Sequence, residues 1–200
     1  IYYYNNIPRV LKDMFPILID YDDNNTWYTM EKIEGINVSS LYTSQLLTPN
    51  LLDNIMNSIG RIHNTVYNKG NTAELNIYEN YTKKMQSRYK SYNYGRFEKS
   101  NDVYCSIYNK LEEYEKANKG ECTVIHGDPV FTNIIINKHD KIKFIDMRGK
   151  VGDTLTIYGD SLYDWAKLYQ SLIGYDCIVM NKDIEESYKQ SLLNCFETKF

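Results

Sequence analysis

Hydrophobic and polar positions follow two different periods along this chain, and its first part has the pattern of a short helix and two strands. Residues 1–15 fit the end of a helix that stops near Pro16. Ile17–Asp20 and Trp27–Lys32 fit two short strands. Because Asp22–Asn25 between them is rich in turn-forming residues, we expect a β hairpin here.

The middle of the chain has the 3.6-residue period of amphipathic helices. Glu34-Gly35 ends the second strand and begins a connector, and the next helix starts where Thr48 can cap it and Pro49 fits its first turn. The apolar stripe of this helix consists of Leu52, Ile55, Met56, Ile59 and Ile62, followed by His63. Further helices are expected over 76–92, 101–118, 160–173 and 183–197. The helix over 101–118 places Val103, Ile107, Tyr108, Leu111 and Tyr114 on one side.

Between these helices the period changes to that of strands. Cys122–Ile125 fits a short buried strand, and Ile134–Ile136 and Ile142–Ile145 alternate around the polar turn Asn137–Lys141, which predicts a second hairpin. The loop Met147–Gly159 contains three glycines and is expected to be irregular. The order of elements is therefore a small hairpin, a mainly helical body and a second hairpin, which predicts an α+β fold.

Size and composition limit the classes of function. The 200 residues suggest one ordinary domain with a sizeable core. The net charge of −3 argues against a general nucleic-acid surface, and no apolar run has the length of a membrane span or the form of a signal peptide. We therefore expect a cytoplasmic protein. The four cysteines are scattered without a C-x-x-C pair, which disfavours a zinc site or a disulfide framework.

The loop before the second hairpin holds the most informative residues. It reads His126-Gly127-Asp128-Pro129-Val130-Phe131-Thr132-Asn133, and Asp146 follows eighteen residues after Asp128. Protein kinases have the pattern H-R-D-x-x-x-x-N in their catalytic loop, with a second Asp downstream that binds metal. Here Gly127 replaces the Arg, and the interval between the Asp and the Asn is the same. The pattern therefore points to phosphoryl transfer from ATP.

These residue types suit phosphoryl transfer, which depends on positioning and on neutralising charge. Asp128 would orient and deprotonate the acceptor hydroxyl, while Asn133 and Asp146 offer a neutral and a charged oxygen to Mg²⁺. Each residue also has a structural interpretation: Asp128 as a turn former, Asn133 as an Asx turn and Asp146 as a cap. The joint spacing and the strand–loop–hairpin context favour the functional interpretation.

Three motifs together resemble the aminoglycoside phosphotransferase and choline kinase family. They are His126-Gly127-Asp128 with Asn133, then Phe144-Ile145-Asp146, and Tyr163-Asp164-Trp165-Ala166-Lys167. The resemblance implies a protein-kinase-like fold and the phosphorylation of a small-molecule hydroxyl. It also implies Asp128 as the catalytic base, Asn133 and Asp146 as magnesium ligands, and ATP and Mg²⁺ as cofactors.

The resemblance assigns supporting roles to two further residues. His126 matches the family's histidine, which shapes the loop, and Asp164 matches an aspartate that braces it. His63 lies on the apolar helical stripe, where a packed and hydrogen-bonded role is favoured over catalysis.

The segment Tyr28–Gly35 resembles the interlobe linker of the family, where backbone groups bind adenine. By that alignment the Glu31 carbonyl and the Ile33 amide would bind the base, and Met30 would line the pocket. An apolar strand that ends in Glu-Gly is common, so this motif is less specific than the loop.

The expected acceptor side is defined more loosely. The stretch Arg148–Asp160 resembles a subgroup found with bacterial surface-polysaccharide proteins. Arg148 and Lys150 can pair with phosphate or an acidic substrate group, or they can be solvated loop charges. The segment 76–118 and the helices after Asp160 are expected to form the acceptor site. Acidic residues there can attract a cationic acceptor or simply face solvent; they are Glu112, Glu113 and Glu115.

The expected division of the chain follows from the resemblance. Residues 1–34 would be a remnant of the N-terminal lobe with the linker, and 35–200 the helical C-terminal lobe, with a catalytic loop at 126–133 and a metal-binding segment at 144–149. Family members place a phosphate-covering loop and a lysine ahead of this part, and neither G-x-G-x-x-G nor G-x-x-x-x-G-K-[ST] occurs here. Both ends look cut, so the chain alone is expected to be a fragment with poor activity.

Other functions remain to be weighed against a small-molecule kinase. The main alternative is a non-catalytic, kinase-like module that binds nucleotide or serves as a scaffold. A metal hydrolase using His126, Asp128, His139 and Asp146 is disfavoured, because His139 lies in the polar hairpin turn. A protein kinase is also disfavoured, since neither D-F-G nor A-P-E occurs. The sequence does not indicate the acceptor or the oligomeric state.

Overall fold

The computed structural model describes residues 1–24, 26–66 and 74–200. Its helices are α1 (Tyr2–Asn6), α2 (Val38–Thr43), α3 (Pro49–His63), α4 (Thr82–Ser91), α5 (Ser100–Lys116), α6 (Ser161–Leu172), α7 (Tyr175–Met180) and α8 (Glu186–Lys199), with 3₁₀ helices at Arg9–Met14 and Phe131–Asn133. Its strands are β1 (Leu18–Tyr21), β2 (Tyr28–Met30), β3 (Gly35–Asn37), β4 (Cys122–Val124), β5 (Ile134–Asn137), β6 (Ile142–Phe144), β7 (Lys150–Val151), β8 (Thr154–Leu155) and β9 (Tyr158–Asp160).

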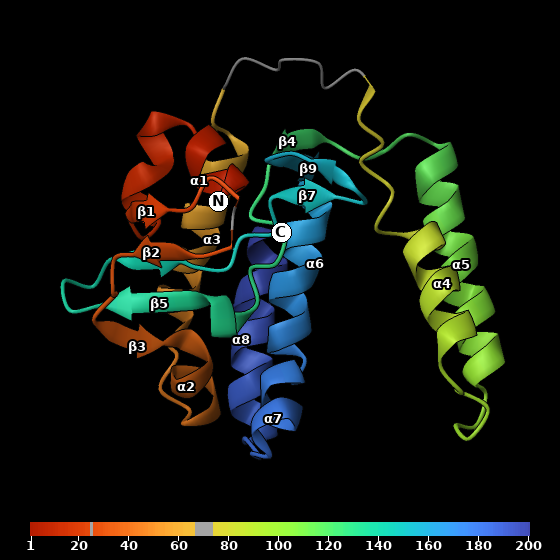
Figure 1. Ribbon diagram of the computed structural model, residues 1–200. Coiled ribbons are helices and arrows are strands. Elements are labelled where there is room, and N and C mark those ends of the chain that lie inside the picture. The colour runs from red at the N-terminus through yellow and green to blue at the C-terminus, as the bar shows by residue number, and fades with distance from the viewer. Residues whose placement is uncertain (25, 67–73) are drawn as a thin grey trace.

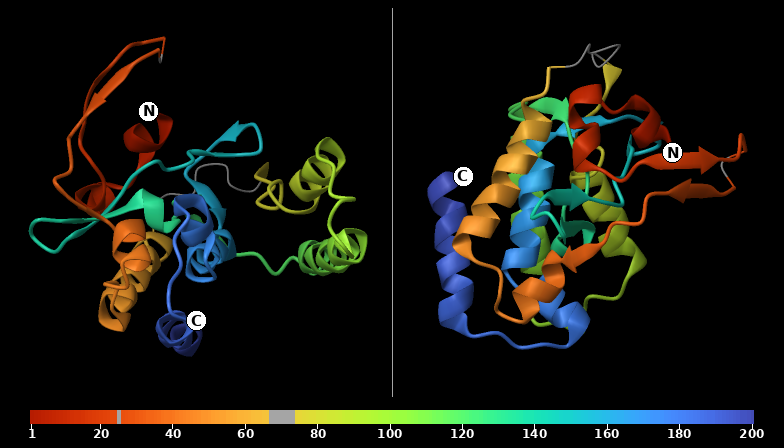
Figure 2. Two further views of the ribbon diagram at one scale, coloured as in Figure 1. Left: turned by 90° about the horizontal axis from the view of Figure 1, so that it is seen from below. Right: turned by 90° about the vertical axis from the view of Figure 1, so that its left-hand side faces the viewer.

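Most of the molecule is one helical body beside small sheets. Figure 1 shows α6 near the middle, with α3 and α8 beside it and the β3–β5–β6 sheet next to them. The pair α4–α5 stands apart on the other side, and Figure 2 shows the same separation from below. In the part of the chain that the structure describes, no helix is both long and apolar enough for a bilayer crossing.

Helix α3 is the centre of the core, as its sequence pattern predicts. Its side chains Leu52, Ile55, Ile59 and Ile62 have no exposed surface. Thr48 caps the helix by accepting a hydrogen bond from the Leu51 backbone at 3.2 Å. The same core takes in the N-terminal segment, because it also contains Tyr3, Ile7, Leu11, Met14 and Phe15.

The first hairpin forms as predicted, with β1 and β2 antiparallel. It is shorter than the sequence pattern suggests, since β2 ends at Met30. Asp22 stabilises the turn by accepting hydrogen bonds from the amide and hydroxyl of Thr26. Asn25, part of the predicted turn, lies outside the described residues.

The connector after Glu34 contains a strand that the sequence analysis does not predict. Gly35–Asn37 forms β3, which pairs antiparallel with β5. A Cβ atom on Gly35 would collide with the Ile136 carbonyl oxygen and would lie 2.7 Å from Cγ2 of Ile135. The glycine is therefore needed for close approach of the two strands, and this contact ties the segment after Glu34 to the hairpin that follows the loop 126–133.

We expect Gly35→Ala to lower the free energy of unfolding by about 1–3 kcal/mol, because the added methyl group overpacks the β3–β5 contact. Gly60→Ala is the matched control: Gly60 lies within α3, and its Cβ would meet no atom within 4 Å. Alanine there should raise stability by about 0.5–1 kcal/mol. Urea unfolding followed by circular dichroism measures both changes, and equal effects of the two substitutions would contradict the assigned packing.

The loop Met147–Gly159 is more regular than predicted. It contains β7 and β8, which pair with each other, and β9, which pairs antiparallel with β4. An additional helix, α7, lies before α8. These elements have two to six residues, too few to give a readable hydrophobic period.

Helices α4 and α5 are present, but α4 begins at Thr82, later than residue 76. The apolar side predicted on α5 is only partly covered in the structure. Val103 is 54% exposed and Ile107 is 44% exposed. This side of α5 faces α4, and the two helices pair away from the main body (Figure 1). Near the end of α5, the Tyr114 hydroxyl reaches Asp160 with a hydrogen bond of 2.9 Å.

Candidate active site

The loop 126–133 joins β4 to the β5–β6 hairpin, and its own backbone holds it in shape. The Asp128 amide donates to Nδ1 of His126 at 3.1 Å. The Asp128 carbonyl accepts from Nδ2 of Asn133 at 2.9 Å and from the Val130 amide at 2.9 Å. All these hydrogen bonds use the backbone of Asp128, so its carboxylate makes none of the contacts that shape the loop.

The hairpin brings the second carboxylate beside Asn133. The Ile145 amide donates to the Asn133 carbonyl at 3.0 Å, and Ile134 pairs with Phe144 in the ladder. Asp146 follows with a φ of 58°, in the left-handed region, and its side chain is exposed. Thus Asn133 and Asp146, thirteen residues apart in sequence, start from adjacent backbone positions.

His126 lies buried at the centre of this arrangement. Its Nε2 bonds the Ile145 carbonyl at 3.0 Å, and its Nδ1 accepts from the Asp128 amide. Burial lowers the pKa of His126 below its ordinary value, against the opposing charges of Asp164, Asp128 and Asp146. A neutral ring that donates from Nε2 and accepts at Nδ1 satisfies both hydrogen bonds, so both ring nitrogens of His126 are engaged in contacts that shape the loop.

Asp164 braces the loop from α6. Its carboxylate has no exposed surface and accepts from the amides of His126 and Gly127, each at 2.8 Å. It also contacts Nε2 of His63 at 3.0 Å. His63 is therefore packed and hydrogen-bonded, as expected, and its ring lies edge-on to Trp165. Gly127 has a φ of 86°, and a Cβ there would lie 2.7 Å from Cβ of Arg148.

The structure adds one functional candidate that the sequence analysis missed. Lys167 on α6 forms an ion pair with Asp128, with 3.0 Å between Nζ and Oδ1. The two side chains are 22% and 28% exposed, so the pair is partly screened from water. A signal was present in the sequence, because Lys167 lies three residues after Asp164 and therefore on the same face of the helix.

The donor set fits a magnesium ion that is bound mostly by its nucleotide. Nδ2 of Asn133 is occupied by Asp128, and among the described residues no hydrogen bond engages its Oδ1 or the carboxylate of Asp146. These are hard oxygen ligands of the kind that Mg²⁺ prefers. No group of three or more His, Cys, Asp or Glu suited to a metal occurs in the described ranges, so phosphate and water oxygens would complete the shell. His139 is exposed in the hairpin turn and belongs to no such group.

The predicted nucleotide residues form an extended segment between β2 and β3. Met30 ends β2, and the Glu31 amide donates to the Ile17 carbonyl at 2.8 Å. Within the described part of the chain, the Glu31 carbonyl and the Ile33 amide make no hydrogen bond. The pKa of Tyr4 is raised to about 12, chiefly by burial and also by the charges of Tyr28 and Asp146. Asp146 therefore lies on this side of the site.

The two candidate phosphate contacts have different settings. The Arg148 amide donates to the His126 carbonyl at 3.1 Å, and the Arg148 side chain lies over the ring of Tyr163, with 5.8 Å from Cζ to the centroid. Lys150 is exposed on β7. The structure therefore places Arg148 beside the loop, and it gives Lys150 no contact with the loop among the described residues.

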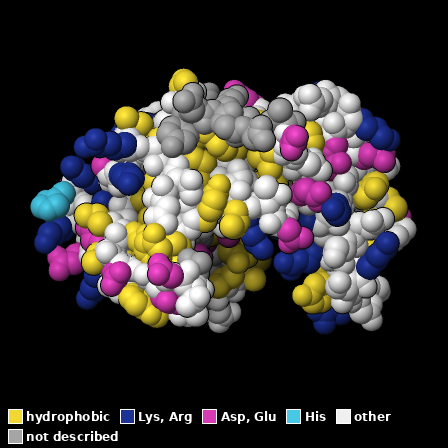
Figure 3. Space-filling model, turned by 45° about the horizontal axis from the view of Figure 1, so that its top comes forward, with side chains coloured by type: hydrophobic (Ala, Val, Ile, Leu, Met, Phe, Trp, Pro, Cys, Tyr) yellow, Lys and Arg dark blue, Asp and Glu magenta, His cyan; other side chains and the backbone are white. Residues whose placement is uncertain are grey.

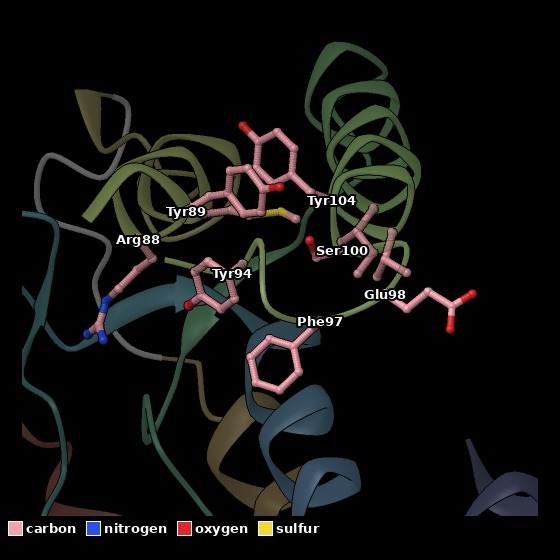
Figure 4. Close-up of a pocket in the computed structure, with 10 residues that line it drawn as sticks. Arg88, Tyr89, Tyr94, Phe97, Glu98, Ser100 and Tyr104 are labelled. Carbon is pink, nitrogen blue, oxygen red and sulfur yellow. The ribbon is translucent and has the colours of Figure 1, made fainter. Parts of the chain in front are cut away.

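A separate apolar groove lies in the α4–α5 pair, away from this chemistry. Its volume is about 500 Å³, and Figure 4 shows Tyr89, Tyr94 and Tyr104 gathered along it. Tyr89 stacks on Tyr104 with ring centroids 3.9 Å apart. Phe97 lies at the end of the groove (Figure 4), and its lining residues all come from the segment 85–107.

No protein-family model matches the sequence, and no curated protein does. The structure is similar to choline kinase LicA from Streptococcus pneumoniae, with a TM-score of 0.59 and 17% identity over 97% of this chain and 60% of that chain. An ethanolamine kinase from Plasmodium vivax has a TM-score of 0.56 and 17% identity, over 98% of this chain and 55% of that one. An aminoglycoside phosphotransferase from Streptomyces rimosus, solved with ADP and streptomycin, has a TM-score of 0.52 and 14% identity, over 93% and 76% of the two chains.

These likenesses confirm the predicted fold class, α+β and protein-kinase-like. The chain spans 55–60% of the length of the choline and ethanolamine kinases that it resembles. The predicted boundary between residues 1–34 and 35–200 stays a prediction.

Proposed function

We propose that this chain holds the catalytic centre of a small-molecule kinase, which uses Mg²⁺ and transfers the γ-phosphoryl group of ATP to an alcohol. One arrangement supports this proposal above all: the partly exposed Asp128, the Asn133 amide bonded to it, and the exposed Asp146 converge on one hairpin. The fold shared with three small-molecule kinases agrees with it.

Asp128 acts in this proposal as the base that orients the acceptor. Lys167 holds its Oδ1, so Oδ2 accepts the hydrogen bond of the incoming hydroxyl. The acceptor oxygen forms a bond to the γ-phosphorus as the bond from that phosphorus to the bridging oxygen of ADP breaks, and Asp128 takes the hydroxyl proton. Asn133 and Asp146 would hold Mg²⁺, which supplies positive charge to the phosphate oxygens.

The remaining predicted residues form the two ends of the site. The Glu31 carbonyl and Ile33 amide would bind adenine beside Met30, because these backbone groups have no partner among the described residues. His126 and Asp164 keep the loop in place. The acceptor is a hydroxyl of a sugar, an amino alcohol or an aminoglycoside-like compound, and we place the reaction in the cytoplasm, with surface-polysaccharide synthesis as its setting.

Transfer from labelled ATP tests this function. The complete gene product is incubated with Mg²⁺ and a panel of alcohols: choline, ethanolamine, streptomycin, neutral polyols and sugar phosphates. We expect a labelled product with at least one alcohol, and none when EDTA removes the metal. Tight nucleotide binding without transfer to any alcohol would instead establish the non-catalytic module. Transfer that persists in EDTA would contradict the role given to Asn133 and Asp146.

A further inference from the structure

Three cationic side chains converge on the ring of Tyr163, next to the proposed base. Nζ of Lys84 lies 5.8 Å from the ring centroid, Cζ of Arg148 5.8 Å and Nζ of Lys167 6.0 Å. They come from α4, from the segment after β6 and from α6, and none of the three is fully exposed. Like charges gathered around one ring repel one another, and negative charge between them offsets this repulsion.

The described residues supply only part of that charge. Lys167 is paired with Asp128. Lys84 donates to the Tyr163 hydroxyl at 3.3 Å, and neither Lys84 nor Arg148 forms an ion pair with a carboxylate of the described chain.

Two of the nearby carboxylates are engaged elsewhere. Asp160 is buried and accepts from the hydroxyls of Tyr81 and Tyr114 at 2.7 and 2.9 Å. Asp164 is buried under the loop, where it accepts hydrogen bonds from two amides. Asp153 lines a pocket together with Lys84 but forms no ion pair with it, and Asp146 is assigned to the metal in the proposed site, so neither Lys84 nor Arg148 has a paired carboxylate among the described residues.

Both side chains project from well-anchored backbone. The backbone amide of Arg148 donates a hydrogen bond to the His126 carbonyl, and its side chain lies in close contact with Gly127. The start of α4 is fixed by Glu115, which accepts from the amide and hydroxyl of Thr82 at 2.9 and 3.0 Å. Because this pair is preorganised, little conformational entropy is lost when it binds an anion.

The position of Lys84 and Arg148 indicates that they face the acceptor and not the nucleotide. The proposed adenine segment lies next to β2, and Figure 1 shows α4 on the opposite side of α6. Asp146 lies toward the β2 side, because its charge and that of Tyr28 both act on Tyr4. Figure 3 shows the hollow that separates the α4–α5 pair from the body, with Lys and Arg side chains at its edge.

The acidic residues of α5 do not offset this charge at the site. Glu115 is bound to Thr82, and Glu112 forms an ion pair with Lys116 at 2.8 Å. These contacts therefore favour an anionic acceptor over the cationic acceptor that these residues were expected to attract.

We propose that the acceptor of this kinase is an alcohol that carries a phosphomonoester, held by Lys84 and Arg148 while its hydroxyl faces Asp128. This inference rests on the proposed kinase function and narrows its substrate class to phosphorylated sugars or polyols. Arg148 offers a planar fork of donors to phosphate oxygens, and Lys84 adds a point charge.

Binding measurements separate this inference from the kinase function itself. Calorimetry is performed on the complete gene product with Mg²⁺–ADP, and then with glycerol 3-phosphate, glycerol and choline as probes. We expect glycerol 3-phosphate to bind in the millimolar range or tighter, and more tightly than glycerol or choline. Arg148→Gln and Lys84→Gln should each weaken its binding about tenfold to a hundredfold, the usual worth of a hydrogen bond to a charged group.

Lys83→Gln is the matched control. Lys83 is the neighbour of Lys84, but its side chain is 75% exposed and pairs with Glu79. This variant should bind all the probes as the wild type does, and unchanged thermal midpoints show that the variants fold.

Three results would overturn the inference: no binding of glycerol 3-phosphate, equal binding of all three alcohols, or a loss in the two variants confined to Mg²⁺–ADP. The last would place the cations on the nucleotide. Each leaves the kinase proposal standing if the transfer assay succeeds with another alcohol.

Discussion

Asp128→Asn is expected to lower kcat of the transfer reaction by about a hundredfold to ten-thousandfold, the range found for a lost general base. The asparagine keeps the shape of the side chain but cannot accept the hydroxyl proton. The loop should not change, because the hydrogen bonds that shape it at this position use the backbone amide and carbonyl. Single-turnover transfer from labelled ATP measures the effect.

The affinity for Mg²⁺–ATP and the thermal midpoint are the controls for this variant. Both should remain close to the wild-type values, since the Asp128 carboxylate is partly exposed and, within the described ranges, pairs with Lys167 alone. A rate of transfer within threefold of the wild type would remove Asp128 from the role of base. A large loss of thermal stability would show instead that its carboxylate has a structural function.

Asp164→Ala should destabilise the fold by about 3–5 kcal/mol, because each buried donor left without its acceptor costs about 1–3 kcal/mol. Its carboxylate is inaccessible and serves the amides of His126 and Gly127 as well as the ring of His63. Removing it leaves two buried amide donors without acceptors. The free energy of unfolding in urea, followed by circular dichroism, measures this loss.

Asp183→Ala is the matched control, because Asp183 is an exposed aspartate of the segment between α7 and α8. It should change stability by no more than about 0.5 kcal/mol. His63→Ala should cost less than Asp164→Ala, since Asp164 would still accept both loop amides. Equal stability of the Asp164 and Asp183 variants would show that the loop does not depend on its brace.

The parts of the fold that the sequence predicts are those with long or repeated patterns. The stripe of α3 is complete over four turns, and its cap residues are both present, so helix and core follow from it. The hairpin β5–β6 is marked by two isoleucine-rich segments on either side of a polar turn. Asp128 and Asn133 could be recognised because their spacing is fixed by one short loop, which local sequence determines.

The parts that were missed depend on contacts between distant segments. Strand β3 has three residues, and it pairs with β5 about one hundred residues later. Strand β9 likewise needs β4 as its partner. The apolar side of α5 was predicted but its partial exposure was not, because periodicity shows that a helix has an apolar side and not what covers it.

The polar contacts around Asp128 had the same limitation. Lys167 could be placed on the face of α6 that Asp164 occupies, but its contact with Asp128 depends on how the helix packs on the loop. The convergence of Lys84 and Arg148 on Tyr163 joins three elements that no sequence motif connects.

The central claim is that Asn133 and Asp146 share one divalent cation beside Asp128. A crystal structure of the complete gene product with ADP and Mn²⁺, which replaces Mg²⁺ and can be located by its anomalous scattering, tests this most directly. The account predicts one manganese peak within about 2.0–2.4 Å of both Oδ1 of Asn133 and a carboxylate oxygen of Asp146, bridging to the phosphates. A nucleotide-bound structure whose manganese contacts neither side chain would contradict it.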